Sequence, residues 1–164
     1  MTLSRLQLEQ IYFAIKSALT ILYSHDAYLI ENKVNERTIV NRFSIYFQKE
    51  LNERGFSEFN MDVEYNRDHS DIKRTVNFPR GTYPDVIVHR RGSNELNLCI
   101  IEFKTWWRGN IERDISKLID YTSQDGKYKY GLGFSITLNR DIPFIQTVVN
   151  GHILNAAQRS GVLV

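Results

Sequence analysis

Apolar residues recur at helical spacing in three parts of the chain. Intervals of three and four residues between apolar positions predict amphipathic helices over residues 4–24, 36–53 and 111–122. Ser4 and Gln7 have the spacing of a capping box at the start of the first helix. Asn35 is a suitable N-cap for the second helix, and Gly55 is a suitable stop signal after it.

A second pattern, with a period of two, predicts β-strands. Residues 59–66, FNMDVEYN, alternate strictly between apolar and polar, which is typical of a half-buried strand. Similar reasoning predicts strands over residues 85–90, 96–104, 129–138 and 144–149, and a short helix over residues 151–158. Residues 67–83 are polar, irregular and locally basic, and a loop of that length in a compact domain is usually functional or disordered.

The order of these elements predicts an α/β fold with a mixed β-sheet. The first three strands follow one another without a crossover helix, so they should be antiparallel. The helix at 111–122 provides a crossover, so the strand at 129–138 should run parallel to the strand at 96–104. We therefore expect a single domain over residues 1–164, with three antiparallel strands, one parallel strand and helices on the faces of the sheet.

Composition excludes several classes of protein. The net charge of +2 is too small to indicate nucleic-acid binding, so any basic surface must arise from local clustering. Cys99 is the single cysteine, which excludes an internal disulfide, and its apolar neighbours indicate a core thiol in a reducing compartment. We find neither a signal peptide nor an apolar segment long enough to span a membrane. A cytoplasmic protein without a membrane partner is the expectation.

Three charged residues interrupt the most strand-like stretch of the chain, YPDVIVHRRGSNELNLCIIEFKTWW. A turn centred between Ser93 and Asn94 would place Asp85 opposite Glu102, where two carboxylates should repel each other. A divalent cation would compensate, since Mg²⁺ favours one or two carboxylates together with waters and phosphate oxygens. Lys104 would share the face of Glu102, beside the cation, where it could position a water or stabilise charge on a phosphate.

These residues resemble the motif of a known family. Pro84-Asp85, followed across a hairpin by Glu102-Phe103-Lys104, is similar to the signature of the PD-(D/E)xK nuclease superfamily, which has the restriction-endonuclease-like fold. The phrases NERTIVNRF, DVEYN, PDVIVHRRG and IEFK look like a bacterial or phage subgroup of presumed nucleases.

The resemblance also suggests how the chain is organised. The family core consists of a helix, three antiparallel strands, a crossover helix and a parallel strand, which is the order expected over residues 36–138. Residues 1–35 would then be an N-terminal helical extension, and residues 139–164 would be a tail with a strand and a helix. The resemblance covers about two-thirds of the chain and reaches neither of these ends.

The resemblance implies a metal-dependent reaction at the hairpin. Asp85 and Glu102 would bind Mg²⁺, for which Mn²⁺ can substitute, and the backbone carbonyl of Phe103 would join them. Lys104 would orient or deprotonate the attacking water. An acid on the first core helix is common in the family, and Glu36 stands where this chain offers one.

Two further residues have a supporting role under this reading and an ordinary role without it. Lys117 matches a lysine that recurs on the crossover helix of the family, but such a lysine more often covers a solvent-facing flank of its helix. His89 would share a face with Asp85, although lone histidines are more often structural. Glu36 itself has an ordinary role as well, because an acid in a first helical turn complements the helix dipole.

Basic residues near the hairpin and in the long loop are candidates for contacts with nucleic-acid phosphates. They are Lys73, Arg74, Arg80, Arg90, Arg91 and Arg108. Each of them alone reads as a solvated surface charge, and only together do they indicate binding.

The sequence thus predicts a metal-dependent nuclease, an endonuclease acting on DNA. One alternative is a binding module of the same fold that has lost turnover, and another is a partner-binding α/β domain without a nucleic-acid role. Duplex, single-stranded or branched DNA and RNA all remain open as substrates. So does the oligomeric state, although cleavage of a duplex needs two sites and a homodimer would supply them.

Overall fold

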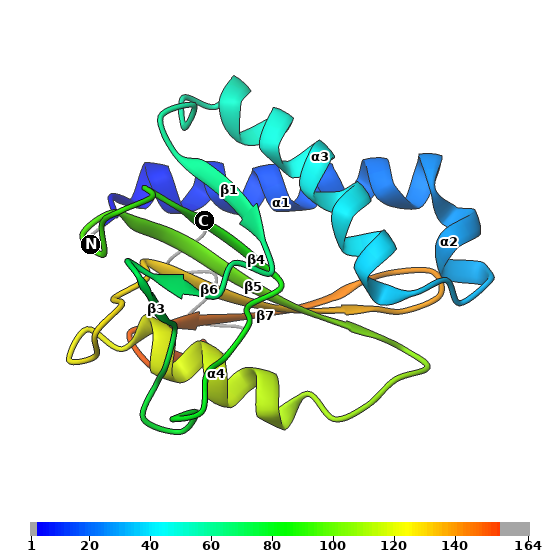
Figure 1. The fold of residues 1–164 in the computed structure, drawn as a ribbon. Helices are drawn as coiled ribbons and strands as arrows, with labels where there is room; N and C mark the ends of the chain where they lie inside the picture. Colours follow the sequence, from blue (N-terminus) through cyan, green and yellow to red (C-terminus); the bar gives the residue numbers. More distant parts are fainter. Residues whose placement is uncertain (1–2, 155–164) are drawn as a thin grey trace.

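The computed structural model describes residues 3–154 as an α/β fold built around a six-stranded mixed sheet (Figure 1). Its strands lie in the order β1 (Asn60–Val63), β4 (Val86–His89), β5 (Asn97–Thr105), β6 (Leu132–Leu138), β7 (Phe144–Val149) and β8 (His152–Ile153). Strands β5 and β6 are parallel, and the other neighbouring pairs are antiparallel. The predicted mixed sheet is therefore confirmed.

Helices cover both faces of this sheet. Helices α1 (Arg5–His25) and α3 (Glu36–Glu53) lie on one face, and α4 (Glu112–Thr122) lies on the other as the crossover between β5 and β6 (Figure 1). The predicted caps form: Ser4 and Gln7 make a reciprocal capping box, and the Asn35 side chain accepts the Arg37 N–H. Local sequence signals thus set where α1 and α3 begin.

Three short elements differ from the prediction. A five-residue helix, α2 (Ala27–Glu31), joins α1 to α3. Within the expected loop 67–83, strands β2 (Arg67–Asp68) and β3 (Asp71–Ile72) form a small hairpin of their own. All three elements are too short to produce a periodic pattern, so apolar spacing could not reveal them.

The helix predicted over residues 151–158 is wrong in its first part. Val149 pairs with His152 across a two-residue turn, and both turn residues, Asn150 and Gly151, have positive φ angles of 47° and 72°. Asn-Gly is the preferred sequence for such a hairpin turn, because both positions need the left-handed conformation. Residues 155–158 lie outside the described part of the chain.

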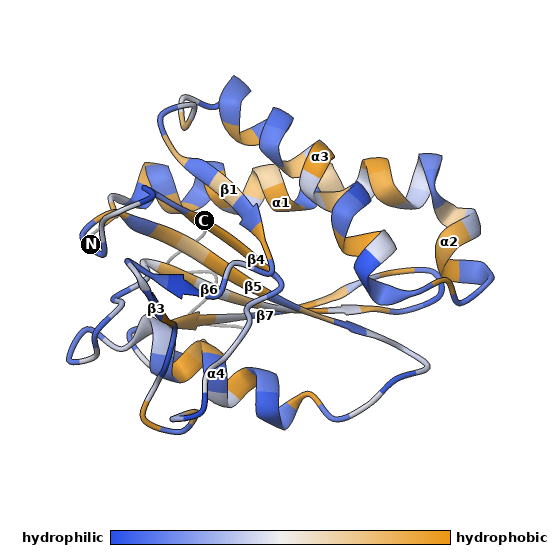
Figure 2. Ribbon diagram, viewed as in Figure 1, coloured by the Kyte–Doolittle hydropathy of each residue, from blue (hydrophilic) through white to orange (hydrophobic). Residues whose placement is uncertain are grey.

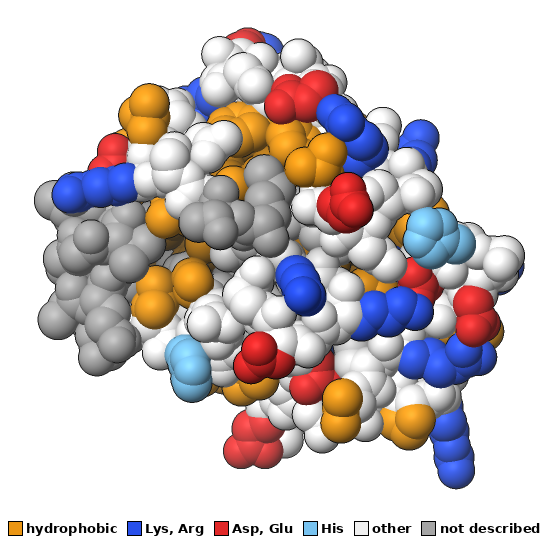
Figure 3. Space-filling model, turned by 90° about the vertical axis from the view of Figure 1, so that its left-hand side faces the viewer, with side chains coloured by type: hydrophobic (Ala, Val, Ile, Leu, Met, Phe, Trp, Pro, Cys, Tyr) orange, Lys and Arg blue, Asp and Glu red, His pale blue; other side chains and the backbone are white. Residues whose placement is uncertain are grey.

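Each helix turns its apolar side toward the sheet, and the strands are largely apolar (Figure 2). On the α4 face, Leu118 and Tyr121 pack with Ile87 and Ile100 of the β4–β5 hairpin and with two tyrosines before β6. Most charged residues lie on the outside, and Lys and Arg are interspersed with Asp and Glu on the face in Figure 3.

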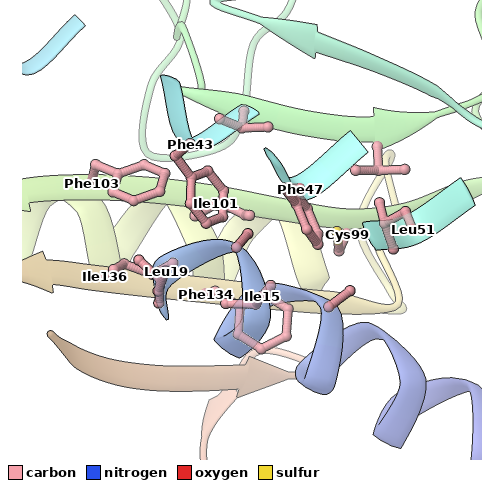
Figure 4. Close-up of a cluster of buried hydrophobic side chains, with 14 of the residues drawn as sticks. Ile15, Leu19, Phe43, Phe47, Leu51, Cys99, Ile101, Phe103, Phe134 and Ile136 are labelled. Carbon is pink, nitrogen blue, oxygen red and sulfur yellow. The ribbon is translucent and has the colours of Figure 1, made fainter. Parts of the chain in front are cut away.

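The larger core lies between the sheet and helices α1 and α3 (Figure 4). Phe43 and Phe47 project from α3, and the ring of Phe43 meets Phe103 of β5 edge to face with centroids 4.9 Å apart. This contact fixes the end of β5 that carries the charged residues. Within residues 3–154, no helix is long and apolar enough to cross a membrane.

Candidate active site

The β4–β5 hairpin has the predicted register at its open end. Three consecutive pairs join the strands: Val86 with Ile101, Ile87 with Ile100, and Val88 with Cys99. The next step along this ladder brings Asp85 level with Glu102. Asp85 is fixed there, because its Oδ2 accepts the backbone N–H of Phe103 at 2.7 Å. The structure thus brings together the carboxylates that the sequence predicted to face each other.

Helices α3 and α4 add charged residues from both sides of the strand end. Glu36, in the first turn of α3, accepts the backbone N–H of Thr105 at 3.0 Å. Lys117 of α4 donates to Glu102 Oε2 at 2.7 Å. Glu36 and Lys117 therefore lie beside the predicted motif, as expected, and Glu36 does so while also standing at a helix N-terminus.

Asp114 of α4 links the two lysines of the site. Its Oδ1 lies 3.1 Å from Lys117 Nζ, and its Oδ2 lies 2.9 Å from Lys104 Nζ. Lys104 Nζ is also 4.0 Å from a Glu36 oxygen. The Lys104–Asp114 contact is an ion pair rather than an aligned hydrogen bond, since no donor in the described chain points at Asp114 Oδ2. Carboxylates and ammonium groups thus alternate through the site.

Burial raises the pKa values of the two motif carboxyl groups. The pKa of Asp85 rises to about 6, first because of burial, and the N–H of Phe103 only partly opposes this rise. The pKa of Glu102 rises well above its usual range, because the group is buried and Asp85 lies close by. Ionising these two carboxyl groups in the folded protein therefore costs free energy.

The two lysines show the opposite balance. Burial lowers their pKa values, but the neighbouring carboxylates outweigh it and raise the pKa of both Lys104 and Lys117. For Lys104 the main carboxylate is Asp114, and for Lys117 it is Glu102. Both side chains are therefore held as ammonium ions at neutral pH.

The donor set fits a divalent cation. The site contains four carboxylates and two ammonium groups, a formal excess of two negative charges, carried by Glu36, Asp85, Glu102, Asp114, Lys104 and Lys117. Glu102 Oε1 is buried and has no hydrogen-bond partner among the described residues. A divalent cation beside Asp85 and Glu102 would offset the excess charge and take up this oxygen, and Mg²⁺ needs only one or two protein carboxylates.

The carboxylates of the site do not converge on one point among the described residues. Among residues 3–154, no group of three or more His, Cys, Asp or Glu side chains stands ready to hold a metal ion together. Lys117 lies against the Glu102 oxygen that is not orphaned. A cation that takes up Oε1 would therefore repel the Lys117 ammonium group on the other oxygen of the same carboxylate.

A hollow of about 300 Å³ opens beside the carboxylates. Its lining includes Glu36 and Asp85 from the site, together with Arg37, Glu64 and Arg108. A larger hollow of about 630 Å³ lies between α1 and residues 141–145, but its walls are mainly apolar and its charged residues are Lys16 and Asp141. The smaller hollow is the one that gives a substrate access to the candidate chemistry.

His89 is not brought into this site. It faces the same side of the sheet as Asp85, but it lies four residues along the strand, about 13 Å away. A β-bulge after Val88 shifts the register there. The His89 ring is buried, its Nε2 lies 2.9 Å from Asp62, and burial lowers its pKa despite that carboxylate. Arg91 pairs with the same Asp62, so both residues anchor β1.

The other predicted basic residues divide into three groups. Lys73 is 1% exposed, so its ammonium group does not belong to the surface, contrary to the expectation of a phosphate contact. Arg74 is paired with Asp71 at 2.6 Å. Arg80, Arg90 and Arg108 are exposed, and of these Arg108 lines the hollow at the site. The basic surface near the carboxylates is therefore smaller than the sequence suggested.

Sequence reasoning missed two charged residues that the structure places here. Asp114 precedes Lys117 by three positions, a spacing that puts two side chains on one face of a helix, so this signal was present. Arg37 lies next to Glu36 in the first turn of α3 and pairs with Glu64 at 2.7 Å. Nothing in the local pattern distinguishes Arg37 from an ordinary surface arginine.

Comparisons with known proteins add no assignment. A scan against protein-family models, a search of the curated proteins and a search of the solved structures found no match for this chain. What the site can do is therefore argued from its own geometry and chemistry.

Proposed function

We propose that this protein is a metal-dependent nuclease with a restriction-endonuclease-like core, acting on DNA at the β4–β5 hairpin. The observation that carries the proposal is the position of Asp85 beside Glu102, one step beyond the last pair of the β4–β5 ladder, with Lys104 two residues further on. A purely structural sheet gains nothing from a partly buried Asp85 beside a buried Glu102, because Asp85 raises the free-energy cost of ionising Glu102.

Each residue of the site has a defined task under this proposal. Asp85 and Glu102, with the carbonyl of Phe103, would hold Mg²⁺ or Mn²⁺. The bound ion would lower the pKa of a water and stabilise negative charge on the scissile phosphate. Lys104, kept protonated by its carboxylate partners, orients the attacking water and offsets charge on the phosphate rather than accepting a proton. Glu36 fixes the backbone of Thr105 and so the end of β5.

The hollow beside the carboxylates supports a phosphodiester as the substrate. Arg37 and Arg108 line it among the acids Glu36, Glu64 and Asp85, so two cationic side chains lie beside the reacting groups. Phosphates are bound by such side chains, and a phosphodiester placed between them would lie next to the metal ligands. A small neutral substrate would make no ion pairs with these arginines.

Cleavage of labelled DNA tests the proposal. A panel of duplex, single-stranded and branched DNA would be incubated with Mg²⁺ or Mn²⁺ and the wild-type, Asp85→Asn, Lys104→Ala or Asp125→Asn protein. Asp125 is exposed and remote from the motif, so its variant is the matched control. We expect wild type and Asp125→Asn to cut, and the two motif variants to lose at least about 100-fold in rate.

Two other outcomes would point to the alternatives. DNA binding without cleavage in either metal would favour an inactive binding module, which the Lys117–Glu102 ion pair would suit because the lysine already neutralises the carboxylate. Equal cutting by all four proteins would place the activity elsewhere and reject the hairpin as the active site.

A further inference from the structure

Asp114 has more than the usual role of an acid at a helix start. An acidic residue in the first turn of a helix complements the dipole and does so from the surface. Glu112, in the same turn of α4, is exposed and suits that role. Asp114 is 3% exposed and turned inward, where burying a carboxylate costs free energy unless it is paired. Its burial therefore needs an explanation from the site.

The contacts of Asp114 provide one. One carboxylate oxygen lies 2.9 Å from Lys104 Nζ, and the other lies 3.1 Å from Lys117 Nζ. The contact with Lys104 anchors Asp114 independently of Lys117. Lys117 in turn has two carboxylates within reach, because Glu102 Oε2 lies 2.7 Å from the same ammonium.

Lys117 and a divalent cation are rivals for Glu102. The side chain of Glu102 is only 1% exposed, so the cation and the ammonium cannot both occupy its neighbourhood without strong repulsion. If Lys117 had no other partner, leaving Glu102 would strand a largely buried ammonium group. Asp114 removes that penalty, because its second oxygen already holds the lysine.

We infer that Asp114 is a positioning residue for cation binding: it retains Lys117 when a divalent cation takes Glu102, and so it makes the metal site accessible. The inference rests on the proposed function in one respect, namely that Glu102 is a metal ligand. Asp114 itself touches neither the cation nor the substrate and acts through Lys117.

A double-mutant cycle with Mn²⁺ binding as the readout tests this inference. Isothermal titration calorimetry would compare wild type, Asp114→Asn, Lys117→Met and the double variant, with Glu112→Gln as the matched loss of charge in the same helical turn. No cleavage is needed. Thermal unfolding would check that each protein is folded, and Asp114→Ser would replace the asparagine variant if that one does not fold.

We expect Asp114→Asn to weaken Mn²⁺ binding roughly tenfold while Lys117 is present, because the lysine then stays on Glu102. Lys117→Met should tighten binding by a similar factor, since the rival is gone. In the Lys117→Met background the Asp114→Asn change should have at most about a threefold effect. Glu112→Gln should bind Mn²⁺ as wild type does.

An equal loss in both backgrounds would overturn the inference, because Asp114 would then act on the cation only through its charge. If the cycle is additive while wild type binds Mn²⁺ and cuts DNA, the proposed function stands and this inference fails. If wild type binds no Mn²⁺ at all, the metal site is rejected, and so are both the proposed function and the inference about Asp114.

Discussion

At the scale of single residues, Asp85 is a group whose charge lowers the stability of the fold although the proposed metal site requires it. Its carboxyl group is partly buried beside Glu102, and burial raises its pKa from 3.8 to about 6. At pH values between about 4 and 6, the folded protein keeps a proton on Asp85 that the unfolded chain releases. The free energy of unfolding contributed by this group therefore falls as the pH rises from about 4 to 6, and it stays low above that window.

The Asp85→Asn variant should accordingly be more stable than wild type at neutral pH without a metal ion. Asparagine keeps an oxygen for the Phe103 N–H and carries no charge, so we expect a gain of about 2 kcal/mol at pH 7 in EDTA. Urea unfolding between pH 4 and 8 would measure it. Glu58→Gln, an exposed control, should show no such gain. A stability difference that shrinks as the pH rises would contradict the burial argument.

Some side chains of the site could be predicted from the sequence, and one could not. Asp85, Glu102 and Lys104 stood out because a charge in an apolar strand is rare, and strand pairing could be worked out from the turn. Asp114 did not stand out, because a first-turn acid on an amphipathic helix is ordinary. Its burial depends on how α4 packs against β5, which local spacing does not determine.

At the scale of elements, long periodic segments were predictable and short ones were not. Helices α1, α3 and α4 and strand β5 form close to their predicted bounds, since nine or more patterned residues outweigh local variation. The β2–β3 hairpin is held instead by tertiary contacts. Asp68 of β2 accepts from Asn94 and pairs with Lys127, both distant in sequence. Such contacts give no periodic signal within residues 67–72 themselves.

Lys73, directly after β3, is the most unusual part of this hairpin. Its ammonium group is buried among three tyrosine rings, 4.6 Å from the centroid of Tyr128 and 5.8 Å from those of Tyr65 and Tyr130. Burial lowers its pKa to about 8, and Asp68 only partly opposes this. The unfolded chain therefore binds more protons between pH 8 and 10.5, so this group makes the protein more stable as the pH rises through that window.

Lys73→Met should remove that pH dependence. Methionine fills a similar volume without a charge, so we expect the variant to be at least as stable as wild type at pH 7, with the difference closing toward pH 10. Chemical unfolding at pH 7, 8, 9 and 10 would show this. Lys49→Met, on the exposed side of α3, should follow the wild-type curve. A variant that is several kcal/mol less stable at pH 7 would mean that the cation–π contacts outweigh burial.

At the scale of the whole molecule, charge is arranged locally rather than globally. The net charge is +2, and positive and negative side chains are mixed on the face in Figure 3. A general attraction to nucleic acid is therefore weak, and under the proposed function DNA binding would depend on the few cations beside the site. Arg37 and Arg108 are the arginines that line the hollow there, and they come from α3 and from the segment after β5.

Binding of DNA should therefore depend on these two arginines and on salt in a specific way. With Ca²⁺ replacing Mg²⁺ to prevent cleavage, we expect Arg37→Ala and Arg108→Ala each to weaken binding of a short labelled duplex or single strand. Each should also reduce the slope of log affinity against log salt concentration by about 1, the loss of one phosphate contact. Arg5→Ala, at the far start of α1, should leave both quantities unchanged.

Arg37 must exchange its Glu64 partner for a phosphate, so its effect should be the smaller of the two. Fluorescence anisotropy between 50 and 200 mM salt would measure both, and an unchanged slope in both variants would remove the hollow from the path of the nucleic acid.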